Sequence, residues 1–355
     1  MSGVEPSAGS NASQLENPSV TVVVVVFGEE PQLIPCITAI RESVGVRTEI
    51  VMVENGGSES TIAALEQQGD ITVVRPFRNT GFAEGCNLGA AAGNSEYIAL
   101  INPDALVHRD ALANLIAVAS RSEVGIATAS VRLADRPELL NSAGTEITFM
   151  GLSWAGHFEE PAIEFTSEFP VAAASGAGMV CERTLWNDLG GLVEQYFAYF
   201  EDAEFSVRVW QHGLNVTYVP DAIVLHHYKF SKNTNKFFLL ERNRIATAFT
   251  CFEARHLVAI APLYLVMELA LIALAVRGGW IKEKMRAYWW ILRHLRWLRR
   301  RRSQVQHQRN ASIRPFYDLL STSLTPGNLP DVHQPRFVER SVAAYWHIVR
   351  RIARL

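Results

Sequence analysis

Polar residues that could contact a ligand follow four predicted strands of this 355-residue chain, each directly at the end of its strand. These segments are Phe27-Gly28, Glu54-Asn55-Gly56, Arg78-Asn79-Thr80-Gly81-Phe82 and Asn102-Pro103-Asp104. Turn chemistry explains a glycine or an asparagine after any one strand, but their joint occurrence is harder to explain in this way. Because parallel α/β sheets bind ligands at the carboxyl ends of their strands, we expect these side chains to share one edge.

Three acids lie close together further along the chain. Glu201, Asp202 and Glu204 open a predicted helix over residues 201–212, where the helix dipole favours negative charge. The dipole alone would account for the acids, but not for the aromatic residues within 196–200, which would shield a site from water. Since a carboxylate within hydrogen-bond reach of a hydroxyl group can act as its general base, Asp202 is the candidate base, with Glu201 beside it.

Two adjacent histidines, His226 and His227, follow the predicted short strands at residues 216–219 and 222–225. Successive residues of a strand point to opposite faces, so only one of the two should reach a shared site. One histidine packed in the core and the other at the surface would explain the pair without any function.

The elements that would position these residues alternate between strand and helix. The β-branched run Val20–Phe27 predicts a strand that is buried on both faces, as in a parallel sheet. The alternation favours an α/β layer that is built of βαβ units. Further strands are predicted at 49–53, 71–74 and 97–101, and helices at 31–43, 82–93, 109–120 and 180–190.

Composition limits the class of protein. Of all residues, 48% are hydrophobic and 19% are charged, and the length suggests about two domains. The formal net charge of -3 excludes a uniformly basic nucleic-acid binder, so no nucleic-acid partner is expected. The four cysteines include no CxxC pair, which argues against a disulfide framework or a cysteine-based zinc site. Residues 1–18 are polar, do not resemble a signal peptide and are expected to form a disordered tail.

The C-terminal part of the chain has a different composition. Residues 257–276 are an apolar run long enough to span a bilayer, but Pro262 and Glu268 interrupt it. Residues 277–314 contain 12 Lys and Arg against one acid, together with several tryptophans, which is typical of a segment at the surface of an anionic leaflet. We therefore expect residues 253–355 to be a helical, membrane-associated region, with the preceding domain on the cytoplasmic face of the cell membrane. Packing of these helices on the preceding domain, or in a dimer, would also explain the pattern.

Seven segments occur in an order that is informative as a set. They are Val22–Phe27, Val53-Glu54-Asn55-Gly56-Gly57-Ser58, Arg78–Gly89, Asn102-Pro103-Asp104, Gly176-Ala177-Gly178-Met179, Tyr199–Phe205 with Arg208, and Pro220–His227. Together they cover roughly residues 20–250 and resemble the family-2 glycosyltransferases of the GT-A fold, of the rhamnosyltransferase-like and galactofuranosyltransferase-like kind.

The resemblance implies both a fold and a reaction. The fold would be an α/β, Rossmann-like GT-A domain over residues 19–252, with a mostly parallel sheet and helices on both faces. The enzyme would move a rhamnose- or galactofuranose-like sugar from a dTDP- or UDP-linked donor to a hydroxyl group of a glycan or a polyprenyl-diphosphate-linked acceptor, in cell-envelope polysaccharide synthesis. Direct displacement needs no carboxylate nucleophile, so the anomeric carbon should invert.

The resemblance also assigns roles to residues. Donor binding is expected of Phe27, Glu54, Asn79, Gly81, Asn87, Asn102 and Asp104, and acceptor-side contacts are expected of Gly176, Glu204, Arg208, Arg242 and Arg244. Arg242 and Arg244 would face the acceptor's phosphates. Glu54 replaces the aspartate that is usual in the family and typically meets the nucleotide base, which leaves the choice of nucleotide open.

A divalent cation, Mg²⁺ or Mn²⁺, is expected to neutralise the leaving diphosphate. Asp104 would supply one ligand, and the family's histidine after the late strand a second one. His226 and His227 are both candidates, and we favour His226.

Two other functions are compatible with a similar scaffold. A sugar nucleotidyltransferase would need a glycine-rich, basic loop after the first strand, whereas this chain has Gly28-Glu29-Glu30 there. A catalytically inactive scaffold that binds lipid or a partner would not need Asp104, Asp202 and His226 together.

Overall fold

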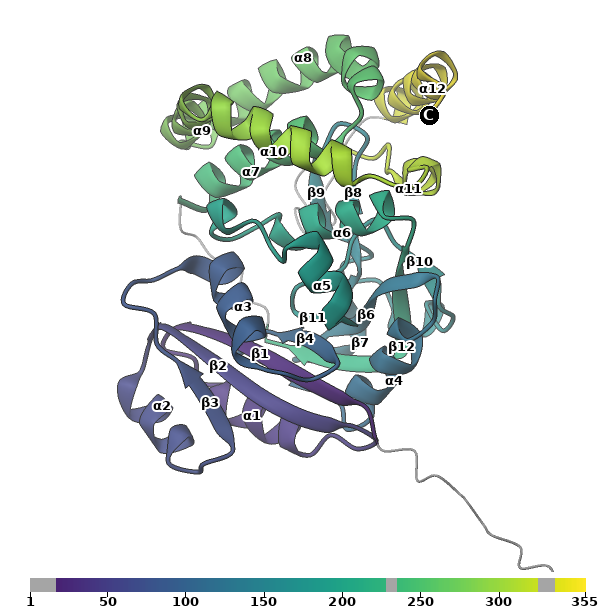
Figure 1. Ribbon diagram of the computed structural model, residues 1–355. Helices are drawn as coiled ribbons and strands as arrows, with labels where there is room; N and C mark the ends of the chain where they lie inside the picture. The colour runs from purple at the N-terminus through teal and green to yellow at the C-terminus, as the bar shows by residue number, and fades with distance from the viewer. Residues whose placement is uncertain (1–16, 228–234, 325–335) are drawn as a thin grey trace, which may run out of the picture.

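The computed structural model describes residues 17–227, 235–324 and 336–355. Apart from Asn17 and Pro18, the predicted tail over residues 1–18 lies outside these ranges. The described residues form a large mixed sheet with helices on both faces, and a group of helices from the C-terminal third at one end of the molecule (Figure 1).

The main sheet has the strand order β10-β12-β6-β11-β4-β1-β2-β3, with β5 beside β12 and β7 beside β6. Strands β3, β2, β1 and β4 run parallel, and β11 is antiparallel to both of its neighbours. These strands are β1 (Ser19–Gly28), β2 (Arg47–Gly57), β3 (Ile71–Val74), β4 (Tyr97–Ile101), β5 (Ala105–Val107), β6 (Val124–Leu133), β7 (Arg136–Ala143), β10 (Phe169–Pro170), β11 (Gly178–Glu182) and β12 (Asn215–His226), and a separate pair is formed by β8 (Thr145–Ile147) and β9 (Ser153–Ala155).

Strand β1 is buried on both faces, as its valine run predicts. Val22 and Val24 belong to one apolar core, whereas Val23 and Val25 belong to the core on the opposite face. The first core is covered by α1 (Leu33–Arg41), α2 (Glu59–Glu66) and α4 (Ala111–Ala119). The second is covered by α3 (Gly81–Ala92), α5 (Arg183–Leu189) and α6 (Glu201–Gln211).

Glycines let α3 lie close against β1. A Cβ atom at Gly85 would be 2.9 Å from Val25 Cγ1, and one at Gly89 would be 2.3 Å from Val23 Cγ1. Because real Cβ atoms do not approach other atoms so closely, these positions need glycine for packing alone. The helix thereby starts directly beside the end of β2.

Two local predictions are wrong. The segment 180–190, expected to be helical, begins in β11 and turns into α5 only at Arg183. The two strands expected at 216–219 and 222–225 are one strand, β12, with an irregularity between Val219 and Ile223 in its pairing with β6. As a result, β12 reaches His226, which pairs with Ala105 of β5.

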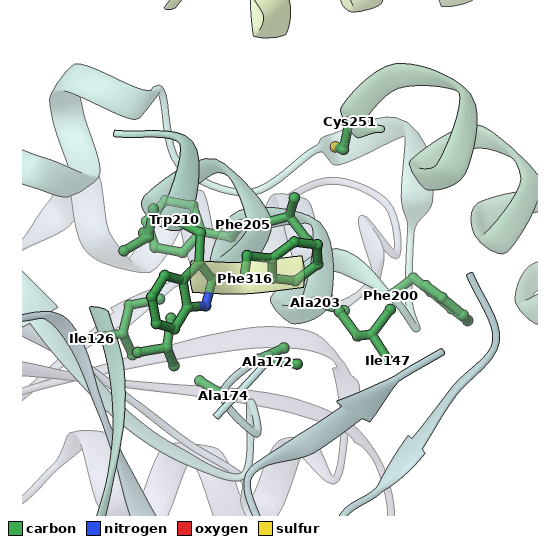
Figure 2. Packing of buried hydrophobic residues seen from close by; sticks show 14 of the residues in the cluster. Ile126, Ile147, Ala172, Ala174, Phe200, Ala203, Phe205, Trp210, Cys251 and Phe316 are labelled. Carbon is green, nitrogen blue, oxygen red and sulfur yellow. The ribbon is translucent and has the colours of Figure 1, made fainter. Parts of the chain in front are cut away.

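The C-terminal helices pack on the end of the sheet domain where α6 lies (Figure 1). They are α7 (Asn235–Cys251), α8 (Ala254–Arg277), α9 (Ile281–Arg293), α10 (Leu295–Gln308), α11 (Arg314–Leu319) and α12 (Arg336–Ala353). Phe316 of α11 belongs to the same buried cluster as Phe205 and Trp210 of α6 (Figure 2).

Candidate active site

A cavity of about 510 Å³ lies between the ends of the sheet strands, the start of α6 and the start of α7. The polar and charged side chains in its wall are Asn102, Asn141, Ser142, Thr145, Ser153, Ser175, Glu201, Asp202, His226 and Lys236, and its aromatic side chains are Phe82, Trp154, Tyr199 and Phe200. Residues that are more than a hundred positions apart in the chain therefore meet in one cleft.

His226 and Asp104 lie side by side because β12 pairs with β5 directly after the Asn102-Pro103-Asp104 turn. The distance from His226 Nε2 to Asp104 Oδ1 is 3.2 Å. Asn102 Nδ2 lies 3.4 Å from the same nitrogen. His226 is largely buried, and the Asp104 side chain is 27% exposed, so a ligand can reach it.

The contacts of the His226 ring determine which nitrogen carries the proton. Nδ1 lies 2.9 Å from the amide oxygen of Asn141, which accepts a hydrogen bond from it. A neutral imidazole that donates through Nδ1 keeps its lone pair on Nε2, and the Asn102 amide can donate to that lone pair. Nε2 and the Asp104 carboxylate then face each other as two electron-pair donors, an arrangement that a cation stabilises.

This donor set fits one divalent cation only when a ligand completes it. The part of the chain that the structure describes contains no cluster of three or more His, Cys, Asp or Glu side chains suited to a metal. One carboxylate and one imidazole suffice when the phosphate oxygens of a bound diphosphate supply the remaining ligands. His227 is not among the residues of the cavity wall, and its backbone N–H donates to the carbonyl of Asp104 at 3.0 Å, so His226 stays the favoured candidate.

Asp202 and Glu201 form an acidic pair in the wall of the same cavity, in which Glu201 is buried and Asp202 is half-buried. Asp202 accepts hydrogen bonds from the backbone N–H groups of Gly176, at 2.9 Å, and Ala203, at 2.7 Å. Burial raises the pKa of Asp202, although these two N–H groups oppose the shift. Among the described residues, Glu201 Oε2 has no hydrogen-bond partner.

The pKa of Glu201 is also raised. Burial, and secondly the charge of Asp202, raise the pKa of Glu201 to about 8. Glu201 therefore favours its protonated form at neutral pH. A proton acceptor that faces a cavity beside aromatic rings is suited to general-base chemistry.

The aromatic segment before α6 has an unusual backbone. Phe197, Tyr199 and Phe200 all have positive φ angles, of 64°, 69° and 71°, which are uncommon for bulky residues. Asn243 of α7, fully buried, donates from its side-chain amide to the carbonyls of Tyr196 (3.0 Å), Ala198 (2.9 Å) and Tyr199 (2.6 Å). Such strain persists only where surrounding contacts hold it, and it sets the point at which α6 and its acids begin.

The sequence predictions did not include Asn243 or Asn141. Asparagine is common in loops and surfaces, and its partners here lie 44 to 47 residues away for Asn243 and 85 residues away for Asn141. Only the position of Asn243, between the two predicted arginines Arg242 and Arg244, could have drawn attention to it.

The donor-side residues are held together by Asn55. Its side-chain amide donates to the carbonyl of Gly81 at 2.8 Å, and its amide oxygen accepts from the backbone and the hydroxyl group of Thr80 at 3.1 and 2.9 Å. Asn79 accepts from the backbone N–H of Gly81. Gly81 has a φ of 77°, and a Cβ there would be 2.4 Å from the carbonyl oxygen of Phe197. The start of α3 is thus tied both to β2 and to the strained segment.

Two aromatic rings are exposed near these strand ends. Phe27, which ends β1, is 61% exposed and packs beside Gly56. Phe77, in the loop after β3, is 99% exposed and was not predicted from the sequence. Glu54 lies 3.6 Å from Arg75. Exposed rings of this kind offer a planar surface for stacking.

Five predicted site residues lie outside the cavity wall and are held in contacts within the protein, so the roles expected for them stay predictions. They are Asn87, whose amide exchanges hydrogen bonds with the backbone of Leu192; Glu204 and Arg208, which pair with each other at 2.8 Å; Arg242, which donates to the carbonyl of Tyr196; and Arg244, which pairs with Glu241 and Glu268. Glu204 and Arg208 do form the predicted pair four residues apart, and Arg301 of α10 joins it at 2.8 Å from Glu204. The charges of Glu204, Arg208 and Arg244 are already neutralised within the protein by their ion pairs.

Comparison with known proteins assigns this chain to a family. A family model described as "Glycosyltransferase like family 2" matches residues 18–250, so the chain belongs to that family. It is similar to the N-acetylglucosaminyl-diphospho-decaprenol L-rhamnosyltransferase of Mycobacterium tuberculosis, with 24% identity over 231 residues that cover 58% of this chain and 75% of the relative. It is also similar to the low-salt glycan biosynthesis hexosyltransferase Agl10 of Haloferax volcanii, with 26% identity, 49% of this chain and 58% of the relative.

Solved structures show that the fold is GT-A. GalNAc-T7, solved with UDP, GalNAc and Mn²⁺, superposes with a TM-score of 0.55 and 15% identity over 69% of this chain and about half (51%) of its own length. The mannosyltransferase PcManGT from Pyrobaculum calidifontis, solved with GDP-Man and Mn²⁺, gives a TM-score of 0.51 and 17% identity over 94% of this chain and 86% of its own. The expected fold class is therefore confirmed, and so is the resemblance to family-2 glycosyltransferases.

Proposed function

We propose that this glycosyltransferase moves a rhamnose- or galactofuranose-like sugar from a dTDP- or UDP-linked donor to a hydroxyl group of a glycan or polyprenyl-diphosphate-linked acceptor, with inversion. The observation that supports this most is that Asp202 and His226 line one cavity, and that Asp104 lies 3.2 Å from His226. His226 with Asp104 is suited to a diphosphate with its cation, and Asp202 is suited to a hydroxyl group that loses its proton.

Asp202 acts as the general base in this proposal. Its carboxylate is held in place by the N–H groups of Gly176 and Ala203, so it does not have to reorient when the acceptor binds. Glu201, protonated at neutral pH, keeps a second negative charge away from Asp202. The acceptor oxygen attacks the anomeric carbon as Asp202 takes its proton, and the bond from that carbon to the diphosphate oxygen breaks. A single displacement inverts the configuration.

Asp104 Oδ1 and His226 Nε2 would hold Mg²⁺ or Mn²⁺, which supplies positive charge to the leaving diphosphate. Asn141 keeps the Nδ1 proton of His226 in place, so that Nε2 stays available as a ligand. Asn102, at the edge of the same cavity, donates toward this nitrogen and orients the ring.

The acceptor class follows from the relatives and from the cavity. The mycobacterial relative is named for a diphospho-decaprenol-linked acceptor, and the cavity combines aromatic rings with Lys236, a cation suited to an anionic acceptor. We further propose that the enzyme works at the cytoplasmic face of the cell membrane, where a lipid-linked acceptor and a nucleotide sugar would meet, and that it serves cell-envelope polysaccharide synthesis.

Turnover of candidate donors by the Asp202→Asn variant tests this function. The asparagine has the same shape but cannot take a proton, so sugar transfer should fall by a factor of about 10²–10⁴ while nucleotide binding persists. The anomeric configuration of the wild-type product, measured by NMR, should be opposite to that of the donor. Transfer near the wild-type rate, or retention of configuration, would overturn the assignment.

A further inference from the structure

Helix α8 presents a continuous uncharged stripe to the solvent. Val258, Leu265, Leu269 and Val276 are 76, 65, 68 and 63% exposed, and their spacing of seven, four and seven residues places them on one side of the helix. We refer to these four residues as the α8 stripe. The helix is long and apolar enough to cross a membrane, yet only 11% of its most apolar 18-residue stretch is buried. Soluble proteins rarely leave such a surface uncovered.

The opposite side of α8 is joined to the protein by a buried ion cluster. Glu268 lies 2.6 Å from Arg244 of α7 and 2.8 Å from Lys284 of α9, and it also accepts a hydrogen bond from Tyr288. Lys284 is fully buried and pairs with Glu241 as well. A helix that crossed the bilayer alone would place Glu268 in hydrocarbon without these partners, at a high cost in free energy.

Contacts near the start of α8 also lie on its protein-facing side. His256 is hydrogen-bonded to the carbonyl of Phe149 at 2.9 Å. The hydroxyl group of Tyr345, on α12, donates to the carbonyl of Ala259 at 2.7 Å. From its first turns to Glu268, one side of α8 therefore packs on the protein, and the other side is exposed.

The segments before and after α8 pack on each other, so they lie on the same side of any membrane that α8 meets. Phe237 of α7 stacks on Trp280, with ring centroids 4.7 Å apart. The guanidinium group of Arg242 lies 4.9 Å from the ring centroid of Trp290 on α9. A spanning α8 would separate these partners across the bilayer.

Positive charge and an exposed tryptophan lie on α9, the helix that follows α8 in the chain. A groove of about 410 Å³ on α9 is lined by Ile281, Lys282, Met285, Arg286 and Trp289, and Trp289 is 60% exposed. An apolar hollow with two cations at its edge fits a lipid whose headgroup is negatively charged. Further exposed cations on this part of the chain are Arg277, Arg293, Arg296, Arg299 and Arg300.

We propose that the α8 stripe inserts into one leaflet of an anionic bilayer, with α8 lying parallel to the membrane plane, and that the cations of α9 and α10 contact the lipid headgroups. Apolar burial and attraction to anionic lipids together account for this mode of attachment. The proposal concerns attachment alone and does not depend on the sugar that is transferred.

Flotation of the purified full chain with lipid vesicles tests the surface. The chain should float with vesicles of phosphatidylcholine and phosphatidylglycerol, less with phosphatidylcholine alone, and less in 1 M KCl, which screens charge. The double variant Leu265→Glu/Leu269→Glu should lower the partition coefficient at least about tenfold. A matched control, Ile34→Glu/Ile163→Glu, adds two charges at exposed apolar positions of the sheet domain and should float like the wild type. Circular dichroism would check that both variants fold.

Labelling with a membrane-impermeant maleimide tests the orientation of α8. The four native cysteines are buried, so single cysteines at Gln67 on the sheet domain and Arg299 on α10 can be compared. In sealed membrane vesicles of known orientation, a flat α8 predicts labelling of both positions from the same side. Labelling from opposite sides would overturn the flat arrangement.

Each remaining outcome of the flotation experiment either supports or overturns the membrane proposal. Loss of flotation in the stripe variant alone supports the proposal. Failure of the wild type to float, or equal flotation of the stripe variant, overturns it. A wild type that is dimeric by light scattering and fails to float, with a stripe variant that is monomeric, would assign the stripe to a second copy of the chain and overturn the membrane assignment.

Discussion

Replacement of Asn243 by alanine tests whether the strained segment before α6 positions the catalytic acid. The side-chain amide has two N–H donors, and these serve the carbonyls of Tyr196, Ala198 and Tyr199. The carbonyl of Tyr196 keeps Arg242 as a second donor, whereas the partly buried carbonyls of Ala198 and Tyr199 each lose a hydrogen bond, at about 1–2 kcal/mol. Asn243→Ala should therefore lower the free energy of unfolding by roughly 2–4 kcal/mol.

The same change should affect transfer more than binding. Phe197, Tyr199 and Phe200 would relax from their positive φ angles, and the start of α6 with Asp202 would shift. A misplacement of about 1 Å costs roughly 10²-fold in rate, so kcat should fall by about that factor. The Kd for the nucleotide should change by less than kcat, because only the start of α3, beside Phe197, joins the predicted donor-binding residues to this segment.

A stability control separates the two effects. Ile260→Ala removes a fully buried side chain on α8 and should cost about 2–5 kcal/mol. Both variants would be assayed for donor turnover, at a temperature where denaturation curves show each to be folded. If Asn243→Ala kept kcat within about threefold of the wild type, or if Ile260→Ala lost as much, the positioning role would be refuted.

Three further predictions follow from the cavity and the core. Because the pKa of Glu201 is raised from 4.5 to about 8, the folded state holds a proton that the unfolded state releases, so the free energy of unfolding falls as the pH rises from about 4.5 through 8. In urea titrations, Glu201→Gln should remove at least about 1 kcal/mol of this dependence between pH 5 and pH 9. An unchanged pH dependence would contradict the prediction. Asn141→Leu removes the hydrogen-bond partner of His226 Nδ1 and should weaken Mn²⁺ binding about 10- to 100-fold, as measured by calorimetry with nucleotide present. An unchanged Mn²⁺ affinity would show that the tautomer of His226 does not matter. Gly85→Ala places a Cβ 2.9 Å from Val25 Cγ1 and should lower the free energy of unfolding by about 1–3 kcal/mol in denaturation experiments. Adding Val25→Ala should restore part of this stability. A neutral effect of Gly85→Ala, or no partial recovery in the double variant, would show that α3 can move away from β1.

Much of the sheet and the strand-end residues could be predicted from the sequence, because the signals are local. The valine run of β1, the polar residues at the end of β2 and those after β4 depend on neighbours within a few positions. The prediction of Asp104 and His226 at one place also rested on such local segments. It needed the family resemblance to join two positions that are 122 residues apart.

The sequence predictions differ from the structure where a contact with a residue distant in the chain determines the position of a side chain or strand. Glu241, three residues before Arg244, is a local sign of one ion pair, but nothing near Arg244 in the sequence indicates the second one with Glu268, 24 residues away on another helix. Gly178–Glu182 has no local sign of its position between β4 and β6, where it pairs as a strand. Asn87 was expected at the donor, but its partner Leu192 lies 105 residues away. Tertiary packing overrides local preference in each case.

Binding and transfer measured on the same variants test the central claim most directly. Calorimetry with UDP- and dTDP-sugars, with and without Mn²⁺, would be compared with sugar transfer for Asp202→Asn and His226→Ala. We predict that Asp202→Asn keeps metal-dependent nucleotide binding and loses transfer, whereas His226→Ala loses the metal-dependent part of binding as well. Transfer by Asp202→Asn at the wild-type rate, or metal-dependent binding unchanged in His226→Ala, would contradict the account of a base, Asp202, and a metal-binding residue, His226, that line one cavity.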